Sequence, residues 1–342
     1  MKKICFVLPT LQKGGMERVV TELSNHLVNT FDITIICAVG GEIKYSLDSK
    51  VRVIANEKYN KLSLLFFLTK AIRNDNADVV IGFSEFLNPY TIISSKLNSK
   101  KVLVSDRSNP IKRHNLRDRI MRKLTYPLSN GLLAQTNFAK EVFMRRKFNK
   151  VINVLSNPLI NIENSNINYE NKGILMVGRL TKSKNQKEII EIFSKVLNEG
   201  WTLYIVGGGK EREFLENFAI SLGIREKVIF TGEVDDVESY MKKCSIFAYT
   251  SLSEGFPNAL NEAMAFPLAS IAYDCKAGVS DLIENNVNGF LVKEGDKESF
   301  IVKLQELMID ANLRKSIMEK GFSNRVKYHV ATISRNLISF IS

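Results

Sequence analysis

The sequence predicts an α/β protein with two Rossmann-like, doubly wound domains that face each other across a cleft. Short apolar runs with the character of buried strands alternate with amphipathic helical segments, which is typical of parallel sheets. The alternation stops at an Asn-rich stretch, residues 161–171, and then begins again. The length of 342 residues suits two domains of ordinary size.

The first domain is predicted to span residues 1–158. Its strands are expected at residues 4–8, 33–39, 51–54, 79–82, 102–105, 132–134 and 151–155. Helical periodicity fills most of the gaps, at residues 16–29, 62–73, 89–96 and 138–148. Gly14 and Gly15 join the first strand to the first helix, where open parallel sheets bind ligands and glycine lets the backbone approach a phosphate. A plain tight turn is the alternative.

The second domain is predicted over residues 159–329. Its strands are expected at residues 174–177, 203–206, 228–231, 246–249, 268–272 and 290–292. Its helices are expected at residues 186–197, 211–222, 237–243, 257–265, 297–308 and 312–328. A last helix, within residues 330–342, is expected to pack back onto the first domain.

Charge is distributed unevenly along the chain. Residues 1–158 carry 26 Lys and Arg against 12 Asp and Glu, a net charge of +14. The remainder carries 22 against 24, a net charge of −2. This asymmetry indicates an anionic partner for the first half, with a merely solvated basic surface as the alternative.

The cysteines and histidines argue against a metal site. Four scattered cysteines (Cys5, Cys37, Cys244 and Cys275) without a C-x-x-C pair indicate reduced thiols in the cytosol and no zinc site. Three histidines are too few for a His-based metal cluster. The apolar run at residues 4–8 is too short for a signal peptide, and the next longest, residues 62–68, is far short of a membrane span. A cytoplasmic protein is therefore predicted.

The segment 251–265 reads S-L-S-E-G-F-P-N-A-L-N-E-A-M-A and follows an expected strand. Ser253 is expected to cap a helix and Pro257 to occupy its first turn, while Gly255 keeps the turn tight. The amides at the start of this helix would then point toward a phosphate group. An amphipathic helix with a good cap and no ligand is the alternative.

Two carboxylates flank this helix start, Glu254 before it and Glu262 along it. A ligand with a central diphosphate and hydroxyl-rich ends, such as a nucleotide sugar, would match them. Their spacing within S-E-G-F-P-N-A-L-N-E-A-M-A resembles the E-x7-E signature of retaining family-4 glycosyltransferases with the GT-B fold. The resemblance implies that Glu254 lies by the donor sugar and stabilises positive charge at its anomeric carbon, and that Glu262 binds the nucleotide ribose. It implies a donor site that also includes Gly255, Phe256, Pro257 and Asn258.

Two other loops resemble phosphate-binding elements of the same family. Gly14-Gly15-Met16-Glu17-Arg18 is similar to its G-G-A-E-R loop, which implies that the glycines approach the donor phosphate and that Met16 and Glu17 lie at the cleft. The loop after residues 174–177 is similar to its G-R-L…K-N element, which implies that Arg179 and Lys184 hold the donor diphosphate. Ordinary surface charges are the alternative for both.

The remaining site residues also rest on the resemblance. Gly207 and Gly209 are similar to a G-x-G that makes room for the nucleotide. Glu233 and Val234 match the loop that binds the base through backbone groups. Arg107 stands where many members carry a His that touches the donor sugar, so no catalytic His is predicted.

These features predict a retaining glycosyltransferase that needs no metal and no cofactor, with Glu254, Arg179 and Lys184 as its catalytic residues. The expected donor is a UDP-linked hexose or N-acetylhexosamine bound by the second domain. The expected acceptor, bound by the first domain, is a lipid-linked or growing saccharide in surface polysaccharide synthesis.

The basic first half predicts peripheral attachment to the anionic inner face of a membrane, for which Arg119, Arg122 and Lys123 are spaced along one helix side. Two alternatives remain open at this point. A nucleotide-sugar epimerase of the same fold would need a His in its cleft. A non-catalytic binder of anionic polymers such as nucleic acid would need aromatic platforms among its basic residues, and residues 112–123 contain none.

Overall fold

The computed structural model describes residues 1–341 apart from 13, 58, 59, 61, 62, 160–167, 267 and 277. The chain divides into two compact units, one made of Met1–Ile160 and Tyr328–Ser342 and the other of Asn161–Lys327. Most of the Asn-rich stretch lies outside the described residues. Its end forms a turn, in which the Asn171 N–H donates to the Asn168 carbonyl at 3.1 Å.

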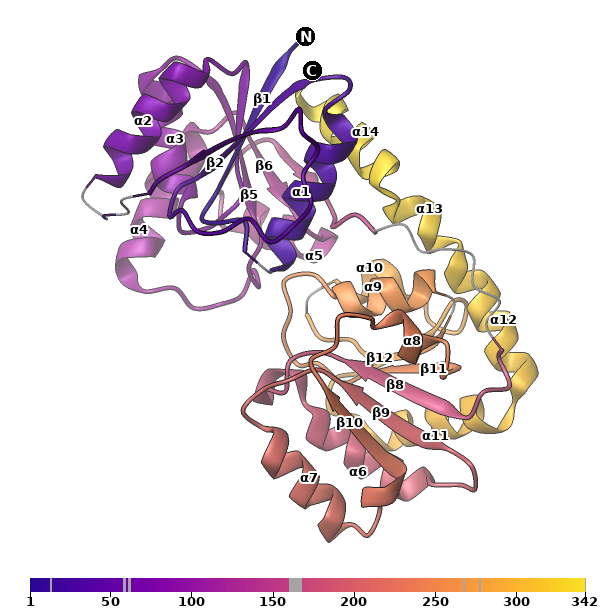
Figure 1. Ribbon diagram of the computed structural model, residues 1–342. Coiled ribbons are helices and arrows are strands. Elements are labelled where there is room, and N and C mark those ends of the chain that lie inside the picture. Colours follow the sequence, from indigo (N-terminus) through magenta and orange to yellow (C-terminus); the bar gives the residue numbers. More distant parts are fainter. Residues whose placement is uncertain are drawn as a thin grey trace. The chain divides into compact units, whose positions relative to one another are not determined.

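The first unit is built on a seven-stranded sheet with the order β3-β2-β1-β4-β5-β6-β7 (Figure 1). All of its strand pairs are parallel. Its strands are β1 (Lys3–Leu8), β2 (Asp32–Cys37), β3 (Arg52–Ala55), β4 (Val79–Gly82), β5 (Lys101–Asp106), β6 (Gly131–Ala134) and β7 (Ile152–Val154). This confirms the seven predicted strands, and the order reverses direction between β1 and β4.

Helices cover both faces of this sheet because its strands are apolar on both sides. The helices are α1 (Gly15–Leu27), α2 (Leu64–Asp75), α3 (Asn88–Leu97), α4 (Leu116–Thr125), α5 (Asn137–Arg145) and α14 (Val330–Ile341), with the 3₁₀ turn η1 (Tyr126–Leu128). In β1, Cys5 and Val7 join the core beneath α2 and α3, whereas Ile4 and Phe6 are buried on the opposite face.

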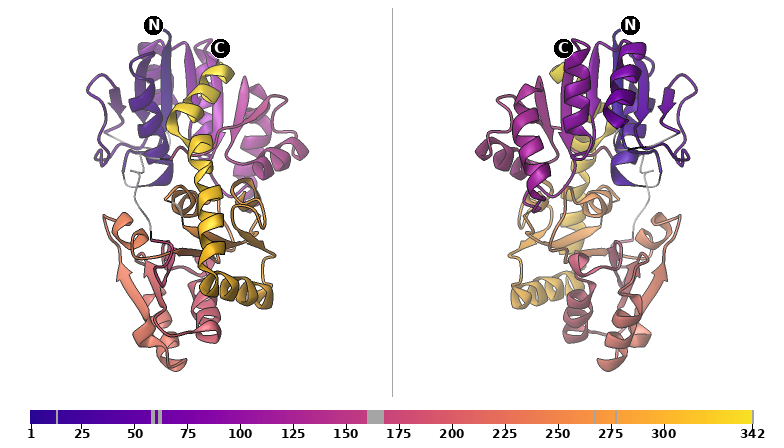
Figure 2. Two further views of the ribbon diagram at one scale, coloured as in Figure 1. Left: turned by 90° about the vertical axis from the view of Figure 1, so that its right-hand side faces the viewer. Right: turned by 90° about the vertical axis from the view of Figure 1, so that its left-hand side faces the viewer.

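The C-terminal helix α14 belongs to the first unit and packs against α1, as Figures 1 and 2 show. Its end is fixed by Lys101, whose ammonium donates to the Ile341 carbonyl at 2.8 Å. The ring of Phe340 lies so close to Gly131 in β6 that a Cβ there would come within 2.7 Å of it. The last helix therefore completes the cover of the first sheet.

The second unit has a six-stranded parallel sheet with the order β10-β9-β8-β11-β12-β13. Its strands are β8 (Gly173–Val177), β9 (Thr202–Val206), β10 (Val228–Gly232), β11 (Ile246–Tyr249), β12 (Ala269–Tyr273) and β13 (Phe290–Val292). All six were predicted. The order reverses between β8 and β11, which is where doubly wound sheets open a crevice for ligands.

Amphipathic helices bury one face each against this second sheet. They are α6 (Gln186–Val196), α7 (Arg212–Ser221), α8 (Glu238–Met241), α9 (Asn258–Ala265), α10 (Val279–Leu282), α11 (Lys297–Ile309) and α12 (Ala311–Phe322), with the 3₁₀ turns η2 (Lys182–Lys184) and η3 (Arg225–Lys227). The short helix α13 (Asn324–Tyr328) follows α12 at the return to the first unit. Ile189, Ile192 and Phe193 of α6 show the pattern, since all three are fully buried in the core.

Two further features bear on the sequence predictions. All four cysteines are free and buried. Among the described residues, no helix combines the length and the apolar character that crossing a membrane requires.

Candidate active site

The predicted donor residues of the second unit gather along one edge of its sheet. They lie in the loops that follow β10, β9, β8 and β11, which are neighbours in the sheet, or in α9. These residues are Arg179, Lys184, Gly207, Gly209, Glu233, Val234, Glu254, Gly255, Phe256, Pro257, Asn258 and Glu262. Loops at the carboxyl ends of parallel strands are where such sheets bind ligands, so the topology supplies a common site for segments far apart in sequence.

The Glu254 carboxylate is the most tightly held group at this edge. One of its oxygens, Oε1, accepts hydrogen bonds from the Tyr249 hydroxyl at 2.7 Å and the Ser251 hydroxyl at 2.8 Å. The same oxygen is ion-paired with the Lys184 ammonium. No donor among the described residues bonds the second oxygen, Oε2. One oxygen is therefore fixed by three donors while the other is left for a ligand.

Tyr249 was not predicted as a site residue. It ends the buried strand β11 and is only 1% exposed. Burial, followed by the negative charge of Glu254, raises the pKa of Tyr249 well above its usual value. The phenol therefore stays protonated and donates to the carboxylate. An apolar strand that ends in a tyrosine five residues before a key Glu is the signal that could have found it.

Lys184 and Arg179 differ in their surroundings although both lie in the loop after β8. The Lys184 side chain is 20% exposed and paired with Glu254. Arg179 is exposed, and its guanidinium makes no hydrogen bond or ion pair within the described part of the chain. Its backbone is fixed, because Gln186 donates to the Arg179 carbonyl at 3.0 Å. The structure thus brings Lys184 to the predicted carboxylate and leaves Arg179 open to an anion.

The glycines after β8 and β9 allow two loops to pack backbone against backbone. Gly207 has φ of +138° and Gly209 has φ of +154°, a region that side chains disfavour. A Cβ on Gly207 would lie 2.2 Å from the Gly178 carbonyl oxygen, and one on Gly209 would lie 2.4 Å from that of Leu180. The Leu180 N–H also donates to the Gly208 carbonyl at 2.8 Å. The glycines therefore hold the loop after β8, which contains Arg179, against the loop after β9.

The start of α9 differs from the prediction. The helix begins at Asn258 with Pro257 at the cap position, so Ser253 is not its cap. The Asn258 N–H donates to the Phe256 carbonyl at 2.9 Å within the turn, which removes one of the amides expected to face a phosphate. Pro257 has a ψ of 69°, outside the helical region, and the residue before a proline disfavours the helical conformation, so the helix starts only after Pro257. Earlier in the loop, the Leu252 N–H donates to the Ser183 carbonyl at 2.9 Å, which ties the chain to the neighbouring loop.

The remaining donor residues take less constrained positions. Asn258 and Glu262 lie one turn apart on α9 and are both half-buried. Glu233 is exposed after β10, and its side chain passes over the glycine loop, since a Cβ on Gly208 would lie 2.8 Å from Glu233 Cγ. Val234 is half-buried beside it.

The glycine loop of the first unit follows β1. Gly14 precedes α1 with an extended backbone, and its N–H donates to the Tyr45 hydroxyl at 2.9 Å while that hydroxyl donates to the Gly14 carbonyl at 2.8 Å. The Glu17 carboxylate folds back over Gly14, where a Cβ would meet Glu17 Oε2 at 2.2 Å. Burial raises the pKa of Glu17. Gly15 is exposed and Met16 is half-buried in the first turn of the helix.

Arg107, predicted at the cleft in place of a His, braces the end of β5. Its guanidinium donates to the Leu155 carbonyl at 3.0 Å and to Asn157 Oδ1 at 2.8 Å, and it lies 4.8 Å from the centroid of the Phe83 ring. Burial lowers the pKa of Arg107 to about 9, although Asp106 acts in the opposite direction.

The expectation that Arg122 contributes to a basic surface is wrong. Its side chain is 3% exposed and is ion-paired with the fully buried carboxylate of Asp106. The guanidinium also lies 5.2 Å from the ring centroid of Tyr126 and 5.0 Å from that of Phe148. Helical spacing alone could not show this, because the partner carboxylate comes from the end of β5.

Comparison with known families assigns the chain. A profile described as "Glycosyltransferase Family 4" matches residues 13–159, and one described as "Glycosyl transferases group 1" matches residues 160–323. The chain is a glycosyltransferase whose first half matches family 4. These matches confirm the resemblance and decide against the epimerase and the non-catalytic binder. Among the residues described in this glycosyltransferase, no three His, Cys, Asp or Glu side chains are grouped so as to hold a metal ion.

Known glycosyltransferases match this one over nearly its whole length. An α-1,4-N-acetyl-D-galactosaminyltransferase of Campylobacter jejuni, whose name specifies GalNAc-α-(1->4)-GalNAc-α-(1->3)-diNAcBac-PP-undecaprenol, is 29% identical over 100% of this chain and 99% of its own. The amylovoran biosynthesis glycosyltransferase AmsD of Erwinia amylovora is 26% identical over 92% of each chain. The structure of Anabaena HepE in complex with UDP is similar with a TM-score of 0.81 at 17% identity, over 98% of each chain. This likeness confirms the GT-B fold.

Proposed function

We propose that this glycosyltransferase moves a hexose or N-acetylhexosamine from a UDP-sugar to a lipid-linked saccharide, with retention of configuration and without a metal. The observation that carries the proposal is the Glu254 carboxylate, held on one oxygen by Tyr249, Ser251 and Lys184 at the ligand-binding edge of the second sheet. The UDP complex of HepE supports the nucleotide, and the undecaprenol diphosphate in the name of the Campylobacter relative supports the acceptor class.

The nucleotide would lie across the loops that follow β8, β9 and β10. The loops that Gly207 and Gly209 allow to pack together would form its floor, Glu233 and Val234 would flank the base, and Glu262 would accept from the ribose hydroxyls. The residues from Gly255 to Asn258 would complete the wall at the start of α9.

The charge of the leaving diphosphate would be met by Arg179 and Lys184. Arg179 has its guanidinium open to solvent, and a guanidinium can fork across two phosphate oxygens. Lys184 has three donors, of which one bonds Glu254, so the same ammonium can also bond a phosphate oxygen. These cations would do the work that a metal performs in other transferases.

The transfer step keeps both bonds on one face of the sugar. The bond from the anomeric carbon to the phosphate oxygen breaks as the acceptor oxygen bonds to the same face of that carbon, and the acceptor proton passes to the departing phosphate. Positive charge develops at the anomeric carbon. The free oxygen of Glu254 would stabilise it, and the three donors on the other oxygen would hold the carboxylate in place.

The lipid part of the acceptor would lie on α4, at the inner face of the membrane. Leu116, Ile120 and Leu124 recur every fourth residue along this helix and are 68%, 48% and 64% exposed. Lys112, Arg113, Arg119, Lys123 and Arg146 line a hollow of about 750 Å³ beside them. Exposed apolar side chains flanked by cations suit a helix lying in an anionic lipid surface, where each cation is worth about 1 kcal/mol. A lipid diphosphate would bind the same cations.

A transfer assay tests the proposal. The purified chain would be incubated with radiolabelled UDP-sugars and bacterial lipid extracts, with the Glu254→Gln variant as control. We expect label to enter the organic phase in the wild type with EDTA present, and NMR to show the donor's anomeric configuration in the product. Inverted product or a need for a divalent ion would overturn the mechanism, and transfer from no UDP-sugar would overturn the donor assignment.

A further inference from the structure

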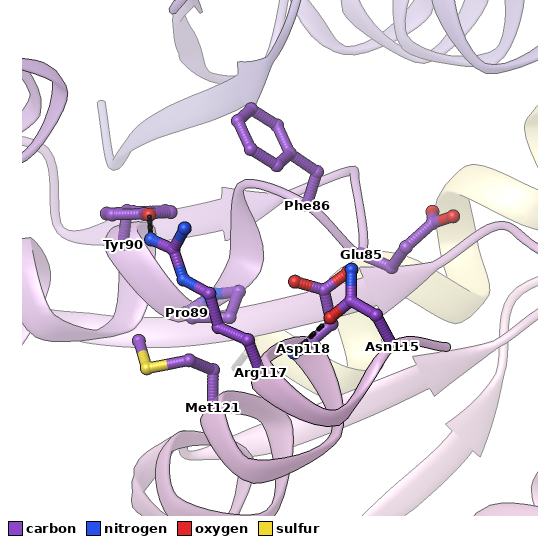
Figure 3. A pocket seen from close by; sticks show the side chains of 8 residues that line it. All are labelled: Glu85, Phe86, Pro89, Tyr90, Asn115, Arg117, Asp118 and Met121. Atoms are coloured by element: carbon purple, nitrogen blue, oxygen red, sulfur yellow. Dashed lines mark hydrogen bonds between the residues drawn. The ribbon is translucent and has the colours of Figure 1, made fainter. Parts of the chain in front are cut away.

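A small pocket in the first unit lies at the carboxyl ends of β4 and β5, which are parallel neighbours. Its volume is about 230 Å³ (Figure 3). One wall is the segment that leads from β4 into α3, with Glu85, Phe86 and Tyr90. The other wall comes from α4, with Arg117, Asp118 and Met121, and from Asn115 just before it. The pocket thus occupies the ligand-binding edge of the first sheet.

The walls of the pocket combine aromatic rings with hydrogen-bonding groups. Phe86 is 42% exposed, and its ring centroid lies 6.1 Å from that of Tyr90. In Figure 3, Arg117 reaches across the pocket to Tyr90, and its guanidinium donates to the Tyr90 hydroxyl at 3.2 Å. The carboxylates of Glu85 and Asp118 also line the pocket. An exposed ring therefore shares the pocket with two carboxylate acceptors and a guanidinium donor.

This chemistry fits one pyranose ring. The C–H groups on one face of a pyranose are apolar and pack on an aromatic ring, while its hydroxyls donate to carboxylates and accept from a guanidinium. Pockets for drug-sized ligands measure roughly 300–1,000 Å³, so a smaller one suits a single sugar. Positive and negative charges balance here, because the pocket holds Arg117 beside Glu85 and Asp118, and the Lys112 ammonium lies 3.5 Å from Glu85 Oε1. A site with balanced charge favours a neutral sugar over a phosphate.

We propose that this pocket binds a sugar of the saccharide acceptor. The proposal rests on the proposed function and adds a division of labour on α4. Arg117, Asp118 and Met121 face the pocket, whereas Leu116, Arg119 and Lys123 line the basic hollow. At about 100° per residue, these two sets lie on different sides of the helix. One side of α4 therefore binds the neutral sugar and the other binds the charged lipid end of the same acceptor.

Saturation-transfer NMR tests the site with the full chain. The probes are the methyl glycosides of glucose, galactose, N-acetylglucosamine and N-acetylgalactosamine, which carry no lipid or phosphate. We expect at least one glycoside to bind the wild type, and Phe86→Ala to bind it about tenfold more weakly. Glu85→Gln should weaken glycoside binding by less than Phe86→Ala does. The matched control is Phe66→Ala, which removes a ring that is 72% exposed on α2 and should leave binding unchanged.

UDP binding, measured in parallel by calorimetry, separates this proposal from the proposed function. No glycoside binding with intact UDP binding, or equal glycoside binding by Phe86→Ala and wild type, would overturn the pocket and leave the donor assignment standing. Glycoside binding that depends on Phe86 without UDP binding would support the pocket and overturn the donor assignment instead.

Discussion

Tyr249→Phe tests whether the position of the Glu254 carboxylate controls the rate. The change removes only the hydroxyl that donates to Glu254 Oε1 at 2.7 Å. The ring stays in the core at the end of β11, where it is 1% exposed, so the fold should persist. Tyr249 would not touch the substrate, so it acts as a positioning residue.

The expected magnitude follows from the other partners of the carboxylate. A hydrogen bond to a charged group is worth about 1.5–3 kcal/mol. Ser251 and Lys184 still hold the same oxygen, and the Glu254 side chain is 14% exposed to water, so the low end applies. A loss of about 1.4 kcal/mol in the transition state lowers kcat about tenfold. The donor KM should change little, because the lost effect concerns charge at the reacting carbon.

Steady-state kinetics with varied UDP-sugar checks this, together with UDP affinity by calorimetry. The matched control is Tyr204→Phe, which makes the same change in the half-buried tyrosine of β9, away from Glu254. We expect both variants to bind UDP as the wild type does. Only Tyr249→Phe should lose kcat. An unchanged kcat, or a rise in donor KM at constant kcat, would show that Glu254 does not depend on this hydrogen bond for catalysis.

Three further predictions concern the donor residues of the second unit and the basic side of α4. Glu254→Gln should mainly lower kcat, and Glu262→Gln should mainly raise the donor KM, because ribose contacts are similar in ground and transition states. Arg179→Ala should weaken UDP binding in calorimetry by about 1.5–3 kcal/mol, the worth of hydrogen bonds to a charged group. Sedimentation should show salt-sensitive binding to anionic vesicles that weakens when Arg119 and Lys123 are both changed to Gln.

Each of these predictions has an outcome that contradicts it. The reverse kinetic pattern would mean that the roles of Glu254 and Glu262 are exchanged. Wild-type UDP affinity in Arg179→Ala would remove this residue from the diphosphate site. Equal sedimentation with neutral and anionic vesicles, or with neither, would mean that the basic side of α4 is only a solvated surface. Arg122 is left out of the vesicle variant because its charge is buried against Asp106.

Local patterns sufficed for the strands, whereas the candidate site residues were predicted from the resemblance to a family. The apolar runs predicted all thirteen strands of the two sheets, and most of these strands are buried on both faces, which needs consecutive apolar residues. The edge strand β3 (Arg52–Ala55) is only partly buried, but it is short and mainly apolar. The apolar runs also placed Gly207, Gly209 and Glu254 directly after strands, where loops meet ligands. The positions of strands and of the loops that follow them depend on residues close together in the sequence, so the spacing of apolar and polar residues predicts them.

Only the tertiary structure decided which of these groups touch. Lys184 and Glu254 are seventy residues apart and meet because β8 and β11 pair in the sheet. The same helical periodicity fits Arg122 and Lys123. Arg122 is nevertheless buried, because it is ion-paired with Asp106 at the end of β5, whereas Lys123 is exposed to solvent. The ion-pair partner of a charged side chain cannot be predicted from the residues next to it in the sequence. The sequence alone therefore determined the strands and the loops between them, while the pairing of charges depended on contacts between segments that the sheet brings together.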